Sequence, residues 1–116
     1  MFGFKNAFQG LKFAFISERN FKIQILFFLI VISAGFYFQI QRLEWLAIFS
    51  ISGFVISLEL INSAIEKLCD LYSTEQNPKI KWVKDVSAAA VLVSSLISIG
   101  VGLTIFLPKV LNIILS

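Results

Sequence analysis

The chain has 116 residues, of which 58% are hydrophobic and thirteen are phenylalanine, and its mean hydropathy is +0.88. A soluble domain of this size has too little interior to bury so much apolar surface, so the composition indicates an all-α integral membrane protein with one domain, residues 1–116. The net charge of +3 would suggest a nucleic-acid partner for a soluble protein. In a membrane protein we assign it to basic residues beside the spans, and we expect no nucleic-acid partner.

The residue types present limit the chemistry. The sequence has one cysteine, Cys69, and no histidine. This excludes an intrachain disulfide, a Cys/His metal site and histidine-based catalysis. A bound metal ion must therefore take oxygen ligands, which favours magnesium.

Residues 2–17 are predicted to form an amphipathic helix on the membrane surface. Apolar side chains recur there at helical spacing, and polar side chains occupy another face: Phe4, Phe8, Leu11 and Phe15 against Lys5, Gln9 and Lys12. The segment is too polar and too short to span a membrane. Ser17 is predicted to be the N-cap of the helix that follows, with Glu18 in its first turn.

Three spans are predicted after this helix, at about 22–40, 45–70 and 85–107. The connection Gln41–Trp45 is very short, which predicts a tight antiparallel hairpin with Trp45 as an interfacial anchor. Pro78 marks a turn before the third span, and Pro108-Lys109 is expected to end that span, leaving a short apolar tail. The third span also has a small residue at every fourth position, a pattern that favours close helix packing: Ala90, Ser94, Ser98 and Gly102.

The basic residues predict the orientation. Eight lie before the first span or between the second and third, namely Lys5, Lys12, Arg19, Lys22, Lys67, Lys79, Lys81 and Lys84, and only Arg42 and Lys109 lie on the other side. We therefore expect the N-terminus and the polar loop to face the cytoplasm.

Four polar residues at the end of the second span share one helical face. We call them the acidic stripe: Glu59, Asn62, Glu66 and Asp70. At about 100° per residue, Glu66 and Asp70 lie about 20° to either side of Glu59. A carboxylate in hydrocarbon costs at least about 2.5 kcal/mol, so the stripe is a candidate functional site.

The stripe begins at membrane depth and continues toward water. Glu59 is the deepest carboxylate and a candidate general base. The shallower carboxylates could bind a divalent ion, and the nearby lysines could bind phosphates. These features are consistent with phosphoryl transfer onto a lipid hydroxyl, without a glycine-rich phosphate loop. Spacing alone leaves two alternatives open, a small proton-coupled transporter and an accessory membrane subunit.

The segment Glu59-Leu-Ile-Asn62-Ser63-Ala64-Ile65-Glu66-x-x-x-Asp70, followed by Pro78 and by Lys84-Asp85-x-x-Ala88-Ala89-Ala90-Val91, resembles the signature of the small prokaryotic diacylglycerol kinases. This family also contains undecaprenol kinases, and the resemblance covers nearly the whole chain. Three further segments are more similar to the undecaprenol kinase branch: Glu18-Arg19-Asn20-Phe21, Glu44-Trp45 and Phe106-Leu107-Pro108-Lys109.

The resemblance implies an ATP-dependent lipid kinase, a homotrimer of three-span protomers with active sites shared between neighbouring chains. Glu59 would be the general base, and Glu18 and Glu66 would hold the Mg²⁺ of MgATP. The resemblance assigns ATP contacts to Glu18, Glu66, Glu75, Gln76, Asn77, Lys84 and Asp85, and supporting polar roles to Asn62 and Asp70. The acceptor would be diacylglycerol or undecaprenol, with undecaprenol favoured.

Overall fold

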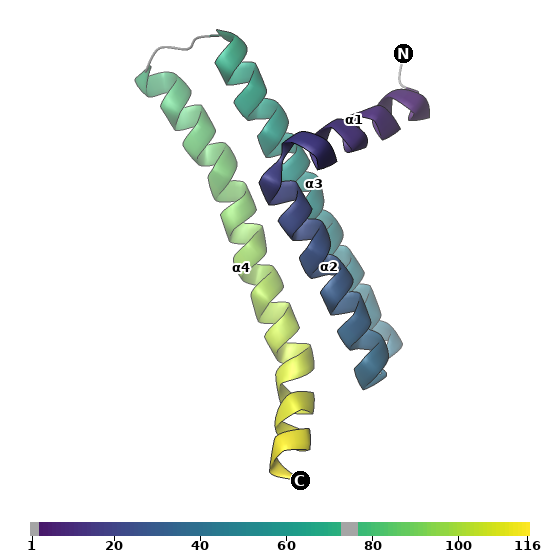
Figure 1. Ribbon diagram of the computed structural model, residues 1–116. Coiled ribbons are helices and arrows are strands. Elements are labelled where there is room, and N and C mark those ends of the chain that lie inside the picture. Colours follow the sequence, from purple (N-terminus) through teal and green to yellow (C-terminus); the bar gives the residue numbers. More distant parts are fainter. Residues whose placement is uncertain (1–2, 73–76) are drawn as a thin grey trace.

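The computed structural model describes residues 3–72 and 77–116, and these form four α-helices (Figure 1). They are α1 (Phe4–Ser17), α2 (Arg19–Phe38), α3 (Arg42–Tyr72) and α4 (Pro78–Leu115). Helices α2, α3 and α4 are each long and apolar enough to cross a membrane. The predicted all-α architecture with three long apolar helices is confirmed.

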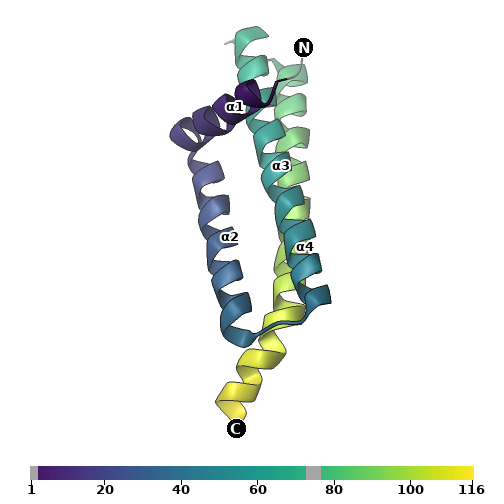
Figure 2. The ribbon, with the colours of Figure 1, turned by 90° about the vertical axis from the view of Figure 1, so that its right-hand side faces the viewer.

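The three long helices lie along the length of the molecule, and α1 lies across one end of them (Figures 1 and 2). Helix α4 packs mainly on α3, and α2 packs on α3 through a smaller contact. The connection between α2 and α3 lies at the end opposite α1, and the last turns of α4 extend beyond it (Figure 2). The molecule measures 58 × 34 × 21 Å.

The α2–α3 connection is the tight hairpin that the sequence predicts. Gln39 ends α2 with φ = 52°, and its backbone amide donates to the carbonyl oxygens of Gly35 and Phe36. The backbone amide of Gln41 donates to Glu44 Oε1 at 2.9 Å, which satisfies a free amide at the start of α3. Trp45 packs directly on Gly35, where an added Cβ would lie 2.6 Å from the Trp45 ring.

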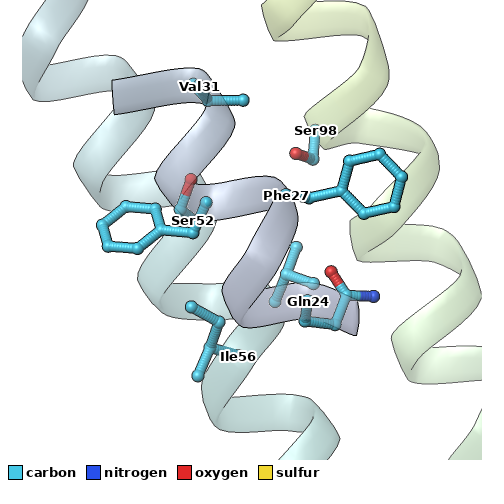
Figure 3. Close-up of a pocket in the computed structure, with 8 residues that line it drawn as sticks. Gln24, Phe27, Val31, Ser52, Ile56 and Ser98 are labelled. Atoms are coloured by element: carbon cyan, nitrogen blue, oxygen red, sulfur yellow. The ribbon is translucent and has the colours of Figure 1, made fainter. Parts of the chain in front are cut away.

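The small-residue pattern of the third span contributes to packing only in its middle. Ser94 is 2% exposed, and Ser98 lines a small cavity of about 50 Å³ where α2, α3 and α4 meet. Figure 3 shows Ser98 close to Phe27 of α2, with Gln24 below them and Ser52 of α3 to the left, across the α2 ribbon. An added Cβ at Gly102 would meet nothing within 4 Å among the described residues of the chain, so close packing at that residue stays a prediction.

The predicted N-cap at Ser17 is wrong. Ser17 is the last residue of α1, and its hydroxyl donates to the carbonyl oxygen of Phe13 at 2.7 Å, so it is not free to cap α2. Glu18 alone separates the two helices, in an extended conformation, and is the N-cap residue of α2 without a side-chain cap hydrogen bond. One residue therefore makes the corner between α1 and α2.

Pro108, predicted to end the third span, lies inside α4, which continues as a helix to Leu115. Proline has no amide hydrogen and costs about 3 kcal/mol in a helix interior, but the residues around it can offset that cost. Here Lys109 Nζ donates to the carbonyl oxygen of Ile105 at 3.1 Å and to Glu44 Oε2 at 3.0 Å. This partly buried ion pair ties α4, just past the proline, to the first turn of α3.

The start of α4 follows the predicted turn but comes earlier than the third apolar span. Asn77 is the N-cap, its side chain accepts from the backbone amide of Lys79 at 2.9 Å, and Pro78 occupies the first helical position. Charged residues recur in the first two turns of α4, so the helix begins about two turns before its uncharged apolar stretch.

Candidate active site

The acidic stripe lies on α3 and is graded from buried to exposed, as the sequence predicts. Glu59 is 3% exposed and Asn62 is 7% exposed, whereas Glu66 and Asp70 are exposed. A buried carboxylate in a protein with an apolar exterior is costly, so Glu59 requires either a partner or a function.

Asn62 links the buried and exposed parts of the stripe. Its side-chain amide donates to Glu66 Oε1 at 3.4 Å. Its buried carbonyl oxygen, Oδ1, has no hydrogen-bond partner among residues 3–72 and 77–116. The site therefore has a free buried acceptor close to its carboxylates.

Glu18 adds a third carboxylate from the corner between α1 and α2. The charges of Glu66 and Glu18 both act on the carboxyl group of Glu59. These three predicted site residues therefore belong to one electrostatic group, although they come from two separate parts of the chain.

The carboxylates fit a metal ion only if other ligands complete its coordination. Among the described residues, no three His, Cys, Asp or Glu side chains come close enough together to hold a metal ion. Magnesium is commonly bound through one or two carboxylates together with substrate phosphates and waters. The oxygen donors of Glu18 and Glu66 fit this mode of binding and do not fit a fully protein-coordinated metal.

Two ion pairs lie at the exposed end of the stripe. Lys84 Nζ contacts Asp70 Oδ1 at 2.7 Å, and Lys81 Nζ contacts Asp85 Oδ2 at 2.6 Å. Lys84 and Asp85, predicted together as nucleotide contacts, thus have different partners. The Lys84–Asp70 pair connects α4 to the stripe, and both pairs are exposed enough to exchange partners at little cost.

The predicted nucleotide contacts of the polar loop lie at the edge of the described structure. Asn77 is described as the N-cap of α4. Glu75 and Gln76 lie outside the described residues.

Sequence reasoning missed a groove between α1 and α3. It has a volume of about 550 Å³ and is lined from α1 and its corner by Ala7, Gly10, Leu11, Phe13, Ala14, Ser17 and Glu18, and from α3 by Leu60, Ser63, Ala64 and Lys67. The α3 residues recur at helical spacing directly beside the acidic stripe, a signal that was present in the sequence. Glu18 lines the groove and also acts on Glu59, so the groove adjoins the carboxylate group.

Comparison with known proteins identifies the family. The model of the prokaryotic diacylglycerol kinase family matches residues 5–106. The chain is 40% identical to an undecaprenol kinase from Bacillus subtilis over 106 residues, 91% of this chain and 86% of that protein. It is 31% identical to a diacylglycerol kinase from Synechocystis over 111 residues, 95% of this chain and 63% of that protein. It is 32% identical to a diacylglycerol kinase from Haemophilus influenzae over 90 residues, 78% of this chain and 76% of that protein.

These matches decide among the functions that spacing left open, because none of the three relatives is named as a transporter or an accessory subunit. They also agree with three apolar helices suited to a membrane. The chain therefore belongs to the prokaryotic diacylglycerol kinase family and is a membrane-bound lipid kinase.

Proposed function

We propose that the chain, as a single domain, transfers the γ-phosphoryl group of MgATP to the hydroxyl of undecaprenol, with diacylglycerol as the alternative acceptor. The observation that carries this proposal is the buried Glu59 carboxyl group, one helical turn before the buried Asn62 that is hydrogen-bonded to Glu66. This carboxyl group would act as a base at membrane depth, next to carboxylates that could bind a metal–phosphate complex.

Glu59 is the proposed general base. It takes the proton of the lipid hydroxyl, the hydroxyl oxygen forms a bond to the γ-phosphorus, and the bond from that phosphorus to the bridging oxygen of ATP breaks to release ADP. Its burial supports this role because it excludes water, the competing acceptor of the phosphoryl group. The free Oδ1 of Asn62 provides a hydrogen-bond acceptor in the same part of the site.

Glu18 and Glu66 are the proposed magnesium ligands, together with the phosphates of ATP. The ion would neutralise charge on the phosphates as the phosphoryl group transfers. Asn62 supports this assignment indirectly, because its amide holds one oxygen of Glu66 and leaves the other for a metal ion.

Lys84 and Asp85 are the proposed nucleotide contacts of α4, with Glu75, Gln76 and Asn77 before them. The exposed Lys84–Asp70 pair supports this role, since a phosphate can replace Asp70 as the partner of the ammonium group. In that case Asp70 holds Lys84 in position when no nucleotide is bound.

The α1–α3 groove is the proposed site of the lipid acceptor. Most of its lining is apolar, and its polar members include Glu18 at the corner between α1 and α2. A lipid chain along the apolar walls would bring a hydroxyl to the carboxylates, which orients it for reaction.

The proposed assembly is a homotrimer in the bacterial inner membrane, with shared active sites on the cytoplasmic side. In it, α1 lies on the cytoplasmic surface of the bilayer. The exposed Phe8 and Phe13, close to Lys5 and Lys12 on the same helix, support this placement because aromatic and basic residues both favour the membrane interface.

The test supplies purified protein in lipid nanodiscs with radiolabelled ATP, magnesium and one acceptor at a time. We expect label in undecaprenyl phosphate at a higher kcat/KM than in phosphatidic acid made from diacylglycerol. A higher kcat/KM for diacylglycerol would overturn the choice of acceptor. Absence of label in any lipid would overturn the proposed reaction.

A further inference from the structure

Lys67 is a cation with no assigned role beside the proposed lipid site. Among the described residues that line the α1–α3 groove, it alone carries a positive charge. The ion pairs of the described residues use Lys81, Lys84 and Lys109 as their cations. Within the described chain, the Lys67 ammonium group is therefore exposed and without a carboxylate partner.

The position of Lys67 on α3 places it above the site of phosphoryl transfer. It lies eight residues after Glu59, about 12 Å farther along the axis, toward the exposed end of the stripe. Ser63 lies one turn before Lys67 and also lines the groove. Ser63 and Lys67 therefore share one face of α3, the face that lines the groove.

The reaction changes the charge of the lipid in this groove. The acceptor alcohol is neutral, whereas a phosphomonoester carries about −1.5 to −2 charges at neutral pH. Glu18 lines the same groove and repels such a product, so a cation is needed there for the product to bind. A lysine binds phosphate as a point charge and gives little affinity for a neutral alcohol.

We propose that Lys67, with the Ser63 hydroxyl beside it, binds the phosphate group of the lipid phosphomonoester product in the α1–α3 groove. The inference rests on the proposed function, because it takes the product of that reaction as the ligand. Its consequence is that Lys67 slows product release and makes the enzyme sensitive to product inhibition.

The experiment measures binding without turnover. Wild type and Lys67→Met are placed in phosphatidylcholine nanodiscs without ATP, and the binding of labelled undecaprenyl phosphate is compared with that of undecaprenol. We expect Lys67→Met to weaken binding of the phosphate about tenfold to a hundredfold, as for loss of one charge-assisted contact, and to leave alcohol binding unchanged. Lys67→Arg should retain most of the affinity, and the inhibition constant of the product in the kinase assay should shift by the same factor.

Lys12→Met is the matched control. It removes the same charge from α1, but Lys12 does not line the groove. Equal weakening by both substitutions would show a general charge effect and overturn the proposal, as would unchanged binding by Lys67→Met. Equally strong competition by phosphatidylglycerol would also overturn it, by showing a site for any anionic lipid. A wild-type protein without kinase activity would contradict the proposed function, whereas these binding measurements test Lys67 separately.

Discussion

The carboxylates of the acidic stripe differ in their surroundings, and this difference separates their proposed roles. Glu59 is buried, and the charges of Glu66 and Glu18 act on its carboxyl group. Glu59 is therefore suited to be a proton acceptor shielded from water. Glu66 is exposed and hydrogen-bonded to Asn62, so it can reach a hydrated metal ion while keeping a fixed orientation. Asp70 is paired with Lys84 and serves to position that lysine.

The first prediction concerns Glu66. Glu66→Gln removes one of two carboxylates proposed to hold magnesium while keeping the size of the side chain. We expect the magnesium concentration for half-maximal activity to rise about tenfold or more, the usual order for loss of one ligand contact. A magnesium titration of kinase activity measures this directly.

Glu44→Gln is the control for that titration. Glu44 is a partly buried carboxylate at the opposite end of α3, paired with Lys109. Its loss should leave the magnesium dependence as in wild type. If Glu66→Gln and wild type show the same dependence, Glu66 is not a ligand.

At the residue scale, the sequence predicts features that depend on a single helix. It does not predict contacts between two helices. Helical periodicity places Glu59 and Glu66 on one face, and the length of the uncharged run before Glu59 predicts that Glu59 is the deeper of the two; Glu59 is buried and Glu66 is exposed. The pairing of Lys84 with Asp70 depends on where α4 crosses α3, and no local pattern contains that information.

At the scale of elements, the α2–α3 hairpin is held by a close aromatic contact. Trp45 stacks on Phe49, with ring centroids 5.6 Å apart, and lies 5.0 Å from the ring of Phe36. Gly35 leaves the space that this group occupies. The hairpin sets the position of α3, and therefore the depth of Glu59, relative to α2.

The second prediction tests this contact. In Gly35→Ala, the new Cβ would lie 2.6 Å from the Trp45 ring, which must move away. We expect a destabilisation of about 1–3 kcal/mol, typical of overpacking in a close-packed contact. Equilibrium unfolding in detergent measures it.

Gly53→Ala is the matched control, because an added Cβ there meets nothing within 4 Å. It should be neutral or should stabilise α3 by up to about 1 kcal/mol, since alanine favours helix over glycine. Equal stability of Gly35→Ala and wild type would contradict the described packing of Trp45.

Local signals for helix ends were only partly reliable, for physical reasons. Asn77-Pro78 correctly marks a helix start, because a side-chain cap and a proline at the first position act locally. Pro108 lies within α4 and does not end it, and the neighbouring Lys109 contacts Glu44, a residue far away in the chain that no local pattern identifies. Ser17 does not cap α2, because its hydroxyl donates to the carbonyl oxygen of Phe13 within α1.

At the scale of the whole molecule, the third prediction concerns the proposed sharing of active sites between protomers. Glu59→Gln and Lys84→Ala should each inactivate the enzyme when present in every chain. If each site takes Glu59 from one chain and Lys84 from a neighbouring chain, a site is intact only when both chains carry the native residue at those positions. With equal, random mixing of the two variants, this holds for about one quarter of the sites. Coexpressed variants should then regain up to about a quarter of wild-type activity.

The readout for this mixture is kinase activity per trimer, with separately purified variants combined after folding as the control. If these trimers keep their own chains during the assay, the combined sample should stay inactive. Mixed trimers that are no more active than either variant alone would contradict sharing of Glu59 and Lys84 between chains.

The proposed lipid kinase reaction depends on Glu59 as its base, and the most direct test of this role is the turnover of Glu59→Gln. The variant in nanodiscs should keep the assembly and ATP affinity of wild type, because the amide has the same shape and α3 packing is retained. Its kcat for lipid phosphorylation should fall by about 10²–10⁴-fold, the usual contribution of a general base. A folded Glu59→Gln enzyme with the kcat of wild type would contradict the account.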